Sequence, residues 1–145
     1  MKKSILIVMA ILATAFVAHA QSGSEEPRVQ QLTYGEFIKK IWNIESNPTT
    51  FTYRGNVPAV IDFYADWCGP CRRVAPIMEE LARLYEGRVQ FYKVNVDQER
   101  GLASTFQVQS IPMVLFIPTE GQPSKQVGAV TKEDYARIIE DRLLK

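Results

Sequence analysis

The sequence predicts an α/β domain in which helices cover both faces of a central mixed β-sheet. Two observations support this fold class. Short apolar runs typical of buried strands alternate with amphipathic helical patterns in the earlier part of the chain. A predicted hairpin and a last helix then follow, and this order indicates a mixed sheet with helices on both faces.

The N-terminal end has the pattern of an export signal. Two lysines precede an apolar stretch over 5–17 and the small-residue cleavage sequence Ala18-His19-Ala20. The stretch is too short to span a bilayer comfortably, and an uncleaved signal anchor is the alternative. The parts that we expect are a cleaved signal peptide over 1–20, a flexible leader over 21–31 and one folded domain over 32–145.

Composition excludes some classes of function. The 145 residues include 17 basic and 16 acidic side chains spread along the chain, so nothing indicates a nucleic-acid partner. The single histidine, His19, lies in the predicted signal peptide. A mature protein without histidine must move protons with a carboxylate, a lysine or water.

The domain begins with a predicted helix. Thr33-Tyr34-Gly35-Glu36 matches a capping box, and apolar residues follow at helical spacing to about Ser46, before Asn47-Pro48. Residues 49–56 are polar and aromatic and fit either a short edge strand or a loop. The apolar run from Val57 to Tyr64 then predicts a buried strand.

A second helix is predicted from Cys68 to Tyr85, with a stop near Gly87. Residues 89–96 are rich in β-branched and aromatic residues and predict a second buried strand, and 98–105 predict a short helix. The side chains of the second helix that we expect to face the core are Val74, Ile77, Met78, Leu81 and Leu84.

The C-terminal part predicts a hairpin and a last helix. The hairpin pairs 114–117 with 126–130 across a turn that contains Gly121. The last helix begins at Thr131, with Asp134 in the fourth position of the cap.

The most informative motif is Trp67-Cys68-Gly69-Pro70-Cys71, which holds both cysteines of the chain. A lone C-x-x-C between a strand and a helix is the arrangement that thiol-disulfide exchange needs. One sulfur is then exposed and acidic at the helix N-terminus, and the other is close enough to attack the mixed disulfide that the first one forms. The motif falls at the carboxyl end of a central strand, where active sites of open α/β sheets gather.

Other roles for the two cysteines fit less well. A structural disulfide across so short a loop removes only about 2 kcal/mol of unfolded-state entropy. A structural zinc site needs four Cys or His ligands. Covalent haem needs a histidine directly after the second cysteine, where this chain has Arg72. We therefore expect redox chemistry with no metal and no cofactor.

Asp62 interrupts the apolar run of the strand that precedes the motif. A carboxylate without a partner in such a strand costs several kcal/mol, or its pKa rises so that it becomes neutral. A raised pKa makes the group a usable proton acceptor near neutral pH. A structural carboxylate with backbone partners explains the same residue equally well.

Five short motifs follow one another in the order of a known family. They are the run from 60 to 71, Val74-Ala75-Pro76, Lys93-Val94-Asn95-Val96-Asp97, Ser110-Ile111-Pro112 and Val127-Gly128-Ala129. With these motifs the chain resembles the thioredoxin family over about 32–145. The resemblance implies the thioredoxin fold and protein-disulfide oxidoreductase activity, with Cys68 as the attacking thiolate and Cys71 as the resolving thiol.

The resemblance also implies roles for residues around the cysteines. Asp62 would take the proton of the resolving thiol through water, with Lys93 close to it. Pro112 matches the family's cis-proline, which lies against the sulfurs, and Ile111 would offer a backbone edge to an extended substrate. The complete docking surface would comprise Trp67, Gly69, Pro70, Ile111, Pro112, Gly128 and Ala129. The last two of these fit an ordinary turn equally well.

Three features depart from the family pattern. Tyr64 stands where many thioredoxins have tryptophan, and the segment 42–56 is longer than in short cytosolic thioredoxins. The predicted signal peptide is the third and most consequential difference, because the best-known thioredoxins work in the reducing cytosol.

Export would place a soluble protein in the periplasm or another compartment where disulfides persist. One hypothesis is a monomeric reductase of protein substrates, kept reduced by a membrane-embedded thiol electron donor. The Gly69-Pro70 pair between the cysteines favours it, because the resemblance is to reducing thioredoxins. The alternatives are a dithiol oxidase that forms disulfides in exported proteins and a binding module with the same fold.

Overall fold

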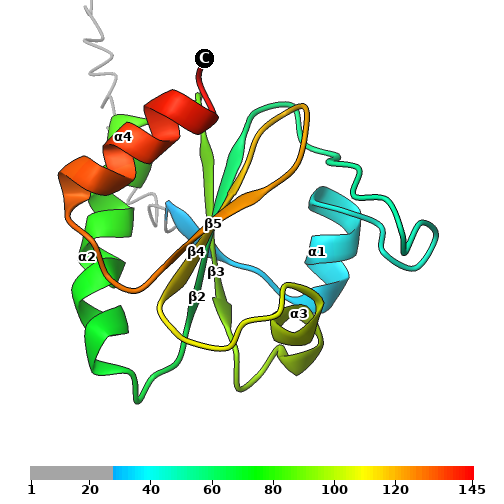
Figure 1. Ribbon diagram of the computed structural model, residues 1–145, viewed down its shortest axis with the longest axis horizontal. Helices are drawn as coiled ribbons and strands as arrows, with labels where there is room; N and C mark the ends of the chain where they lie inside the picture. Colours follow the sequence, from blue (N-terminus) through cyan, green and yellow to red (C-terminus); the bar gives the residue numbers. More distant parts are fainter. Residues whose placement is uncertain (1–27) are drawn as a thin grey trace, which may run out of the picture.

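The computed structural model describes residues 28–145, and the predicted signal peptide lies outside the described residues. Strands and helices alternate along this part of the chain until a final hairpin, which the last helix follows (Figure 1). The strands are β1 (Val29–Gln31), β2 (Ala59–Tyr64), β3 (Gln90–Asn95), β4 (Met113–Ile117) and β5 (Ser124–Val127). The helices are α1 (Tyr34–Lys40), α2 (Gly69–Leu84), α3 (Arg100–Thr105) and α4 (Lys132–Arg142).

One mixed sheet forms the centre of the domain, with the strand order β1-β3-β2-β4-β5. Both β1 and β2 run parallel to β3, whereas β4 pairs with β2 and β5 with β4 in the antiparallel sense. The central strand β2 is apolar except for Asp62, as expected for a strand that is covered on both faces. The predicted α/β class and mixed sheet are confirmed.

Two helices cover each face of the sheet. Figure 1 shows α2 and α4 on one side and α1 and α3 on the other. Alternate residues of β2 point to opposite faces, so Val60 belongs to the α2/α4 core and Ile61 to the α1/α3 core. Asp62 is two residues from Val60 and therefore faces α2. None of the helices between residues 28 and 145 is long and apolar enough to cross a membrane.

Two predictions at the start of the domain are wrong. Residues 29–31 were assigned to the leader but form β1, which pairs with β3. Three residues are too few to show the two-residue period of a strand. The first helix begins at the predicted capping box of Thr33 but ends at Lys40, not near Ser46. The apolar residues that follow Lys40 pack into the core although the chain turns there, and their spacing in the sequence resembles that of a longer helix.

The segment 42–56 is a loop, so the alternative that the sequence left open for residues 49–56 is decided in favour of a loop. Its aromatic residues hold it against the α1/α3 face of the domain. The rings of Trp42 and Phe51 lie 5.3 Å apart, and the Trp42 indole N–H donates to the carbonyl of Asn47 at 3.1 Å. The Arg54 N–H donates to the Ile41 carbonyl at 2.9 Å, so the far end of the loop returns to the end of α1.

Helix α2 has the predicted length, with Cys68 as its N-cap and Tyr85 as its C-cap. One predicted core residue is wrong, because Leu84 is 62% exposed. Tyr85 is buried instead, and its hydroxyl reaches the Ala136 carbonyl of α4 at 3.5 Å. Both residues continue the apolar stripe from Leu81, and the position of α4 decides which of them is covered.

The C-terminal elements follow the prediction closely. The β4–β5 hairpin is present, with Gly121 in its turn at a φ of +97°. The second strand of the hairpin begins at Ser124 and ends at Val127, two residues earlier than predicted at the start and three at the end. Thr131 caps α4 by accepting from the Asp134 N–H at 3.1 Å.

Candidate active site

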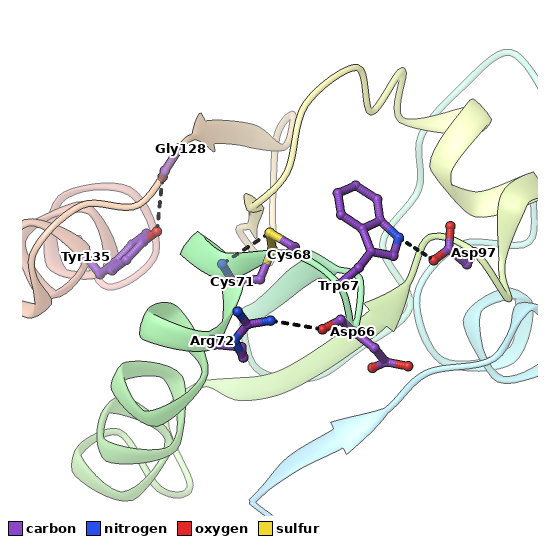
Figure 2. Close-up of a disulfide and its surroundings, with 8 residues drawn as sticks. All are labelled: Asp66, Trp67, Cys68, Cys71, Arg72, Asp97, Gly128 and Tyr135. Atoms are coloured by element: carbon purple, nitrogen blue, oxygen red, sulfur yellow. Dashed lines mark hydrogen bonds between the residues drawn. A yellow bond between two sulfur atoms is a disulfide. The ribbon is translucent and has the colours of Figure 1, made fainter.

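The two cysteines form a disulfide at the start of α2 (Figure 2). Their Cα atoms lie 5.3 Å apart, inside the usual range for a disulfide. Each cysteine residue is only 3% exposed, because Ala65 and Ile111 pack around the pair. The expected exposure of the first sulfur is therefore wrong for the oxidised protein. Exposure does not distinguish the two sulfurs in this state.

The helix N-terminus does distinguish them. Cys68 is the N-cap of α2, and its Sγ accepts a hydrogen bond from the Cys71 N–H at 3.2 Å. A helix N-terminus carries a partial positive charge and unpaired N–H groups, which favour a negative sulfur there. When the disulfide opens, this environment stabilises a thiolate at Cys68. Cys71 lies inside the first turn and is the donor of that hydrogen bond.

Asp62 lies on β2, five residues before Trp67, and is 4% exposed. Its neighbours in the sheet are Lys93 of β3 and Val114 of β4. Among the described residues, its Oδ1 atom has no hydrogen-bond partner. Burial raises the pKa of the Asp62 carboxyl from 3.8 to about 7, and the charge of Lys93 acts in the opposite direction. The unpartnered oxygen argues against a purely structural carboxylate.

A cavity of about 400 Å³ joins Asp62 to the second cysteine. Asp62, Lys93 and Cys71 all line it, together with the apolar side chains of Ala75 and Met78. The space is large enough for several water molecules, and the carboxylate and the ammonium group give them polar partners. A proton can therefore pass between Cys71 and Asp62 without direct contact between the two side chains.

The loop before β4 and the loop after β5 meet beside the disulfide. The Ile111–Pro112 peptide bond is cis, as the resemblance implied. The Gly128 N–H donates to the Pro112 carbonyl at 2.8 Å, and the Tyr135 hydroxyl of α4 donates to the Gly128 carbonyl at 3.3 Å. Gly128 has a φ of +84°, a conformation that glycine adopts without strain. The structure thus places Ile111, Pro112 and Gly128 together.

The remaining predicted surface residues lie at the same end of the domain. Trp67 is 70% exposed, and its indole N–H donates to Asp97 Oδ2 at 2.9 Å (Figure 2). Gly69 and Pro70 form the first turn of α2, and Ala129 is exposed directly after Gly128.

Comparison with known proteins agrees with this geometry. The family model described as Thioredoxin matches residues 38–141. The chain belongs to the thioredoxin family. It is 43% identical over 110 residues to the thioredoxin of Borreliella burgdorferi, which covers 76% of this chain and 93% of that protein. It is 40% identical over 88 residues to thioredoxin 1 of Nostoc, a match that covers 61% of this chain and 82% of that protein. It is 37% identical over 109 residues to a chloroplastic M-type thioredoxin of spinach, a match that covers 74% of this chain and 60% of that protein.

As a thioredoxin family member with a Cys68–Cys71 pair, the protein is a thiol-disulfide oxidoreductase. Within residues 28–145, no group of three or more His, Cys, Asp or Glu side chains is placed to hold a metal ion.

Two further residues of the family motifs, Asn95 and Asp97, contribute to the site although the sequence alone assigned them no role. Asp97 is the acceptor for the Trp67 indole, and Asn95 accepts a hydrogen bond from the Asp97 N–H at 2.9 Å. Their position at the carboxyl end of β3, next to the carboxyl end of β2, was the signal that could have identified them.

The buried carboxylate predicts a pH-dependent gain in stability for Asp62→Asn. The folded-state pKa is above the unfolded one, so the stability that Asp62 contributes at low pH is lost as pH rises from about 4 to about 7. The variant should match the wild type near pH 4 and become more stable by up to about 4 kcal/mol above pH 7, less the cost of burying an amide.

Urea unfolding of the oxidised proteins at several pH values measures this difference. Asp66→Asn is the matched control, because the same change at an exposed carboxylate removes no buried charge. A constant difference between Asp62→Asn and wild type at every pH would contradict the buried ionisation.

Proposed function

We propose that the protein reduces disulfides of other proteins outside the cytoplasm. The observation that carries the direction of the reaction is the environment of Cys68 Sγ, whose hydrogen bond comes from the Cys71 N–H. Strong dithiol oxidants stabilise their reduced form through the thiolate. Here Gly69 has no side chain, and Pro70 offers neither a backbone N–H nor a charge. Because the two residues between the cysteines add no charge that would stabilise the thiolate further, we favour a reductant.

The reaction begins with the reduced protein. The Cys68 thiolate attacks one sulfur of a substrate disulfide, forms a mixed disulfide, and releases the other substrate sulfur as a thiolate that takes a proton from water. Cys71 then loses its proton and attacks Cys68 Sγ. The Cys68–Cys71 disulfide forms, the second substrate thiolate leaves, and two electrons have passed from the protein to the substrate.

Asp62 is the base that we assign to the second step. Its raised pKa of about 7 allows it to hold or release a proton near neutral pH. Water in the shared cavity carries the proton from Cys71. Lys93 lies beside Asp62 in the sheet and lines the same cavity, so its charge favours the ionised carboxylate that the reaction needs.

The surface around the disulfide suits an extended peptide. Trp67 directly precedes Cys68 and is exposed, and Ile111, which precedes the cis peptide bond, packs against the cluster that contains both cysteines. Val127 adds a second exposed apolar side chain, 49% exposed, next to Gly128. An extended segment can pair with the free backbone edge at Ile111 while its disulfide meets Cys68.

The proposals about the compartment and the electron donor are supported by the sequence alone. The apolar stretch over 5–17 and the cleavage sequence after it, which lie outside the described residues, support export. A reductase in an oxidising compartment needs a continuous supply of electrons, and a membrane-embedded thiol carrier can deliver them from the cytoplasm. The oxidase alternative requires the same disulfide and differs in its reduction potential.

The reductase hypothesis predicts a low reduction potential. Equilibration with glutathione should give a value nearer to about −270 mV, typical of thioredoxin, than to about −120 mV, typical of a strong oxidant. Pro70→His is the control, because a cation next to Cys68 stabilises the thiolate and should raise the potential. A wild-type value close to the strong oxidants would change the proposal to disulfide formation.

Asp62→Asn should slow the second chemical step and leave the first almost unchanged. Without the base, breakdown of the mixed disulfide should be slower by about a hundredfold near neutral pH, whereas attack by Cys68 depends on the helix terminus. Rapid-mixing experiments on reduced protein with a labelled peptide disulfide separate the two steps. If the variant breaks down the mixed disulfide at the wild-type rate across neutral pH, Asp62 is a structural residue. Asp66→Asn controls for the loss of one negative charge.

Cys71→Ser should trap the natural partners as mixed disulfides through Cys68. Expressed as the full chain, it should capture exported client proteins and a membrane thiol protein, and its recovered N-terminus should begin near Gln21. The matched Cys68→Ser variant should capture few or none, since it lacks the attacking sulfur. Capture of cytoplasmic proteins alone by a chain with an intact N-terminus would refute export.

A further inference from the structure

Tyr135 of α4 is a buried tyrosine that the redox mechanism does not use. The residue is 0% exposed and belongs to the α2/α4 core. Its hydroxyl donates to the Gly128 carbonyl at 3.3 Å (Figure 2). A buried tyrosine usually directs its hydroxyl to a hydrogen-bond partner. The partner here is a backbone atom of the loop between β5 and α4, which lies beside the disulfide.

A second tyrosine of the same core makes a different kind of contact. Tyr85 is 2% exposed, and its hydroxyl reaches the Ala136 carbonyl at 3.5 Å. That contact joins the end of α2 to α4 and involves no atom of the docking surface. Burial of a tyrosine in this core therefore does not by itself direct its hydroxyl to the loop at the site.

Both peptide groups that flank the Gly128 Cα atom are engaged. The N–H donates to the Pro112 carbonyl at 2.8 Å, and the carbonyl accepts from the Tyr135 hydroxyl. Gly128 has a φ of +84°, and glycine can adopt many other conformations at little cost. Among the described residues, no atom beyond its chain neighbours lies within 4 Å of the place where a Cβ would stand. The two hydrogen bonds, and not packing on that side, therefore select the conformation of Gly128.

The bond between Gly128 and Pro112 continues the β4–β5 pairing toward the disulfide. The last pair of residues in the sheet is Met113 with Val127, and the Gly128 N–H reaches the Pro112 carbonyl one residue further on. The residue before Pro112 is Ile111, which packs against the cluster of the two cysteines. A change at Gly128 is therefore passed to the segment that offers its backbone to a substrate.

The first turn of α4 holds the tyrosine ring in place. Thr131 is the N-cap, and its Oγ1 accepts from the Asp134 N–H at 3.1 Å. Val130 precedes the cap and packs against the core cluster that contains Tyr135, the fourth residue of the helix. A hydrophobic contact between these two positions fixes the direction in which the chain enters a helix. The hydroxyl therefore extends from a rigid base to the loop that precedes the helix.

We propose that the Tyr135 hydroxyl is a positioning group that holds the Ile111–Pro112 segment, through Gly128, in the conformation that binds extended protein substrates. This inference rests on the docking role of Ile111 in the proposed function. The hydroxyl takes no part in the transfer of protons or electrons. Its loss should therefore weaken the binding of substrates that pair with the backbone edge and leave the chemistry of the two cysteines unchanged.

Tyr135→Phe tests the positioning, because it keeps the ring and removes only the hydroxyl. In the oxidised ¹⁵N-labelled protein, the amide proton of Gly128 reports on its hydrogen bond to the Pro112 carbonyl. This resonance should move upfield in the variant, because a less restrained Gly128 makes a longer bond. The Leu32 amide, which donates to the Lys93 carbonyl at 2.9 Å on the other side of the sheet, should stay in place as the reference.

Tyr85→Phe is the matched control, because it removes a hydroxyl of the same core that does not reach the loop. It should leave the Gly128 resonance in place. A Gly128 resonance that stays in place in Tyr135→Phe, or that moves equally in Tyr85→Phe, would overturn the positioning role. If Tyr135→Phe does not fold, para-methylphenylalanine at position 135 fills the space of the hydroxyl without a donor, and the same shift is expected there. An unmoved resonance in that variant would equally overturn the role.

Kinetics test the link to substrate binding. In Tyr135→Phe the KM for insulin disulfides should rise by about three- to tenfold with kcat unchanged, as expected for the loss of one hydrogen bond that acts on binding. The rate with a small aromatic disulfide should not change, since such a reagent does not need the backbone edge. A shifted resonance with an unchanged KM, or an equal loss with both substrates, would overturn this link. If the wild type fails to reduce insulin, the proposed function fails, and the Gly128 resonance still decides the positioning.

Discussion

The burial of the Asp62 carboxylate in the central strand is the constraint on which the rest of the site depends. β2 must be apolar because helices cover both of its faces, yet this position carries an ionisable group whose Oδ1 has no hydrogen-bond partner in the described residues. The resulting rise in pKa to about 7 is the property on which the proposed role of Asp62 as a base depends. Keeping the charged carboxylate buried lowers the free energy of unfolding of the whole domain.

The register of the sheet determines what that carboxyl group can reach. Pairing with β3 places Lys93 beside Asp62, and pairing with β4 places Val114 on its other side. One neighbour supplies a cation and the other supplies no hydrogen-bond donor from its side chain. The cavity under α2 then connects the carboxyl group to Cys71 and leaves Cys68 at the outer end of the helix. A shift of β2 by one residue would point Asp62 into the α1/α3 core and separate it from the cysteines.

The surface around the disulfide comes from loops, and hydrogen bonds hold these loops to the sheet and helices. Gly128 links the Pro112 loop to α4 through Tyr135, and Asp97 links Trp67 to the end of β3. Loops positioned in this way can bind extended substrates without large rearrangement. The thioredoxin family supplies the chemistry, and these contacts set how this member presents it to a partner protein.

Much of the architecture follows from local patterns. The period of the apolar residues predicted β2, β3, α2 and the hairpin, and the capping residues Thr33 and Thr131 predicted where two helices begin. The pattern failed where a segment was too short or where its partner decided the outcome. β1 has only three residues, α1 ends four residues after Glu36 although apolar spacing continues, and α4 covers Tyr85 in place of Leu84.

By itself, the sequence determined the redox motif, its place at the start of a helix and the anomalous acid in the strand before it. Spacing along the chain is enough for these, because each depends on residues close together in sequence. Only the tertiary structure decided that the oxidised cysteines are buried, that Asp62 shares a cavity with Cys71 and that the Trp67 indole donates to Asp97 beyond the end of β3. These contacts join residues brought together by strand pairing and helix packing, and no local period encodes them.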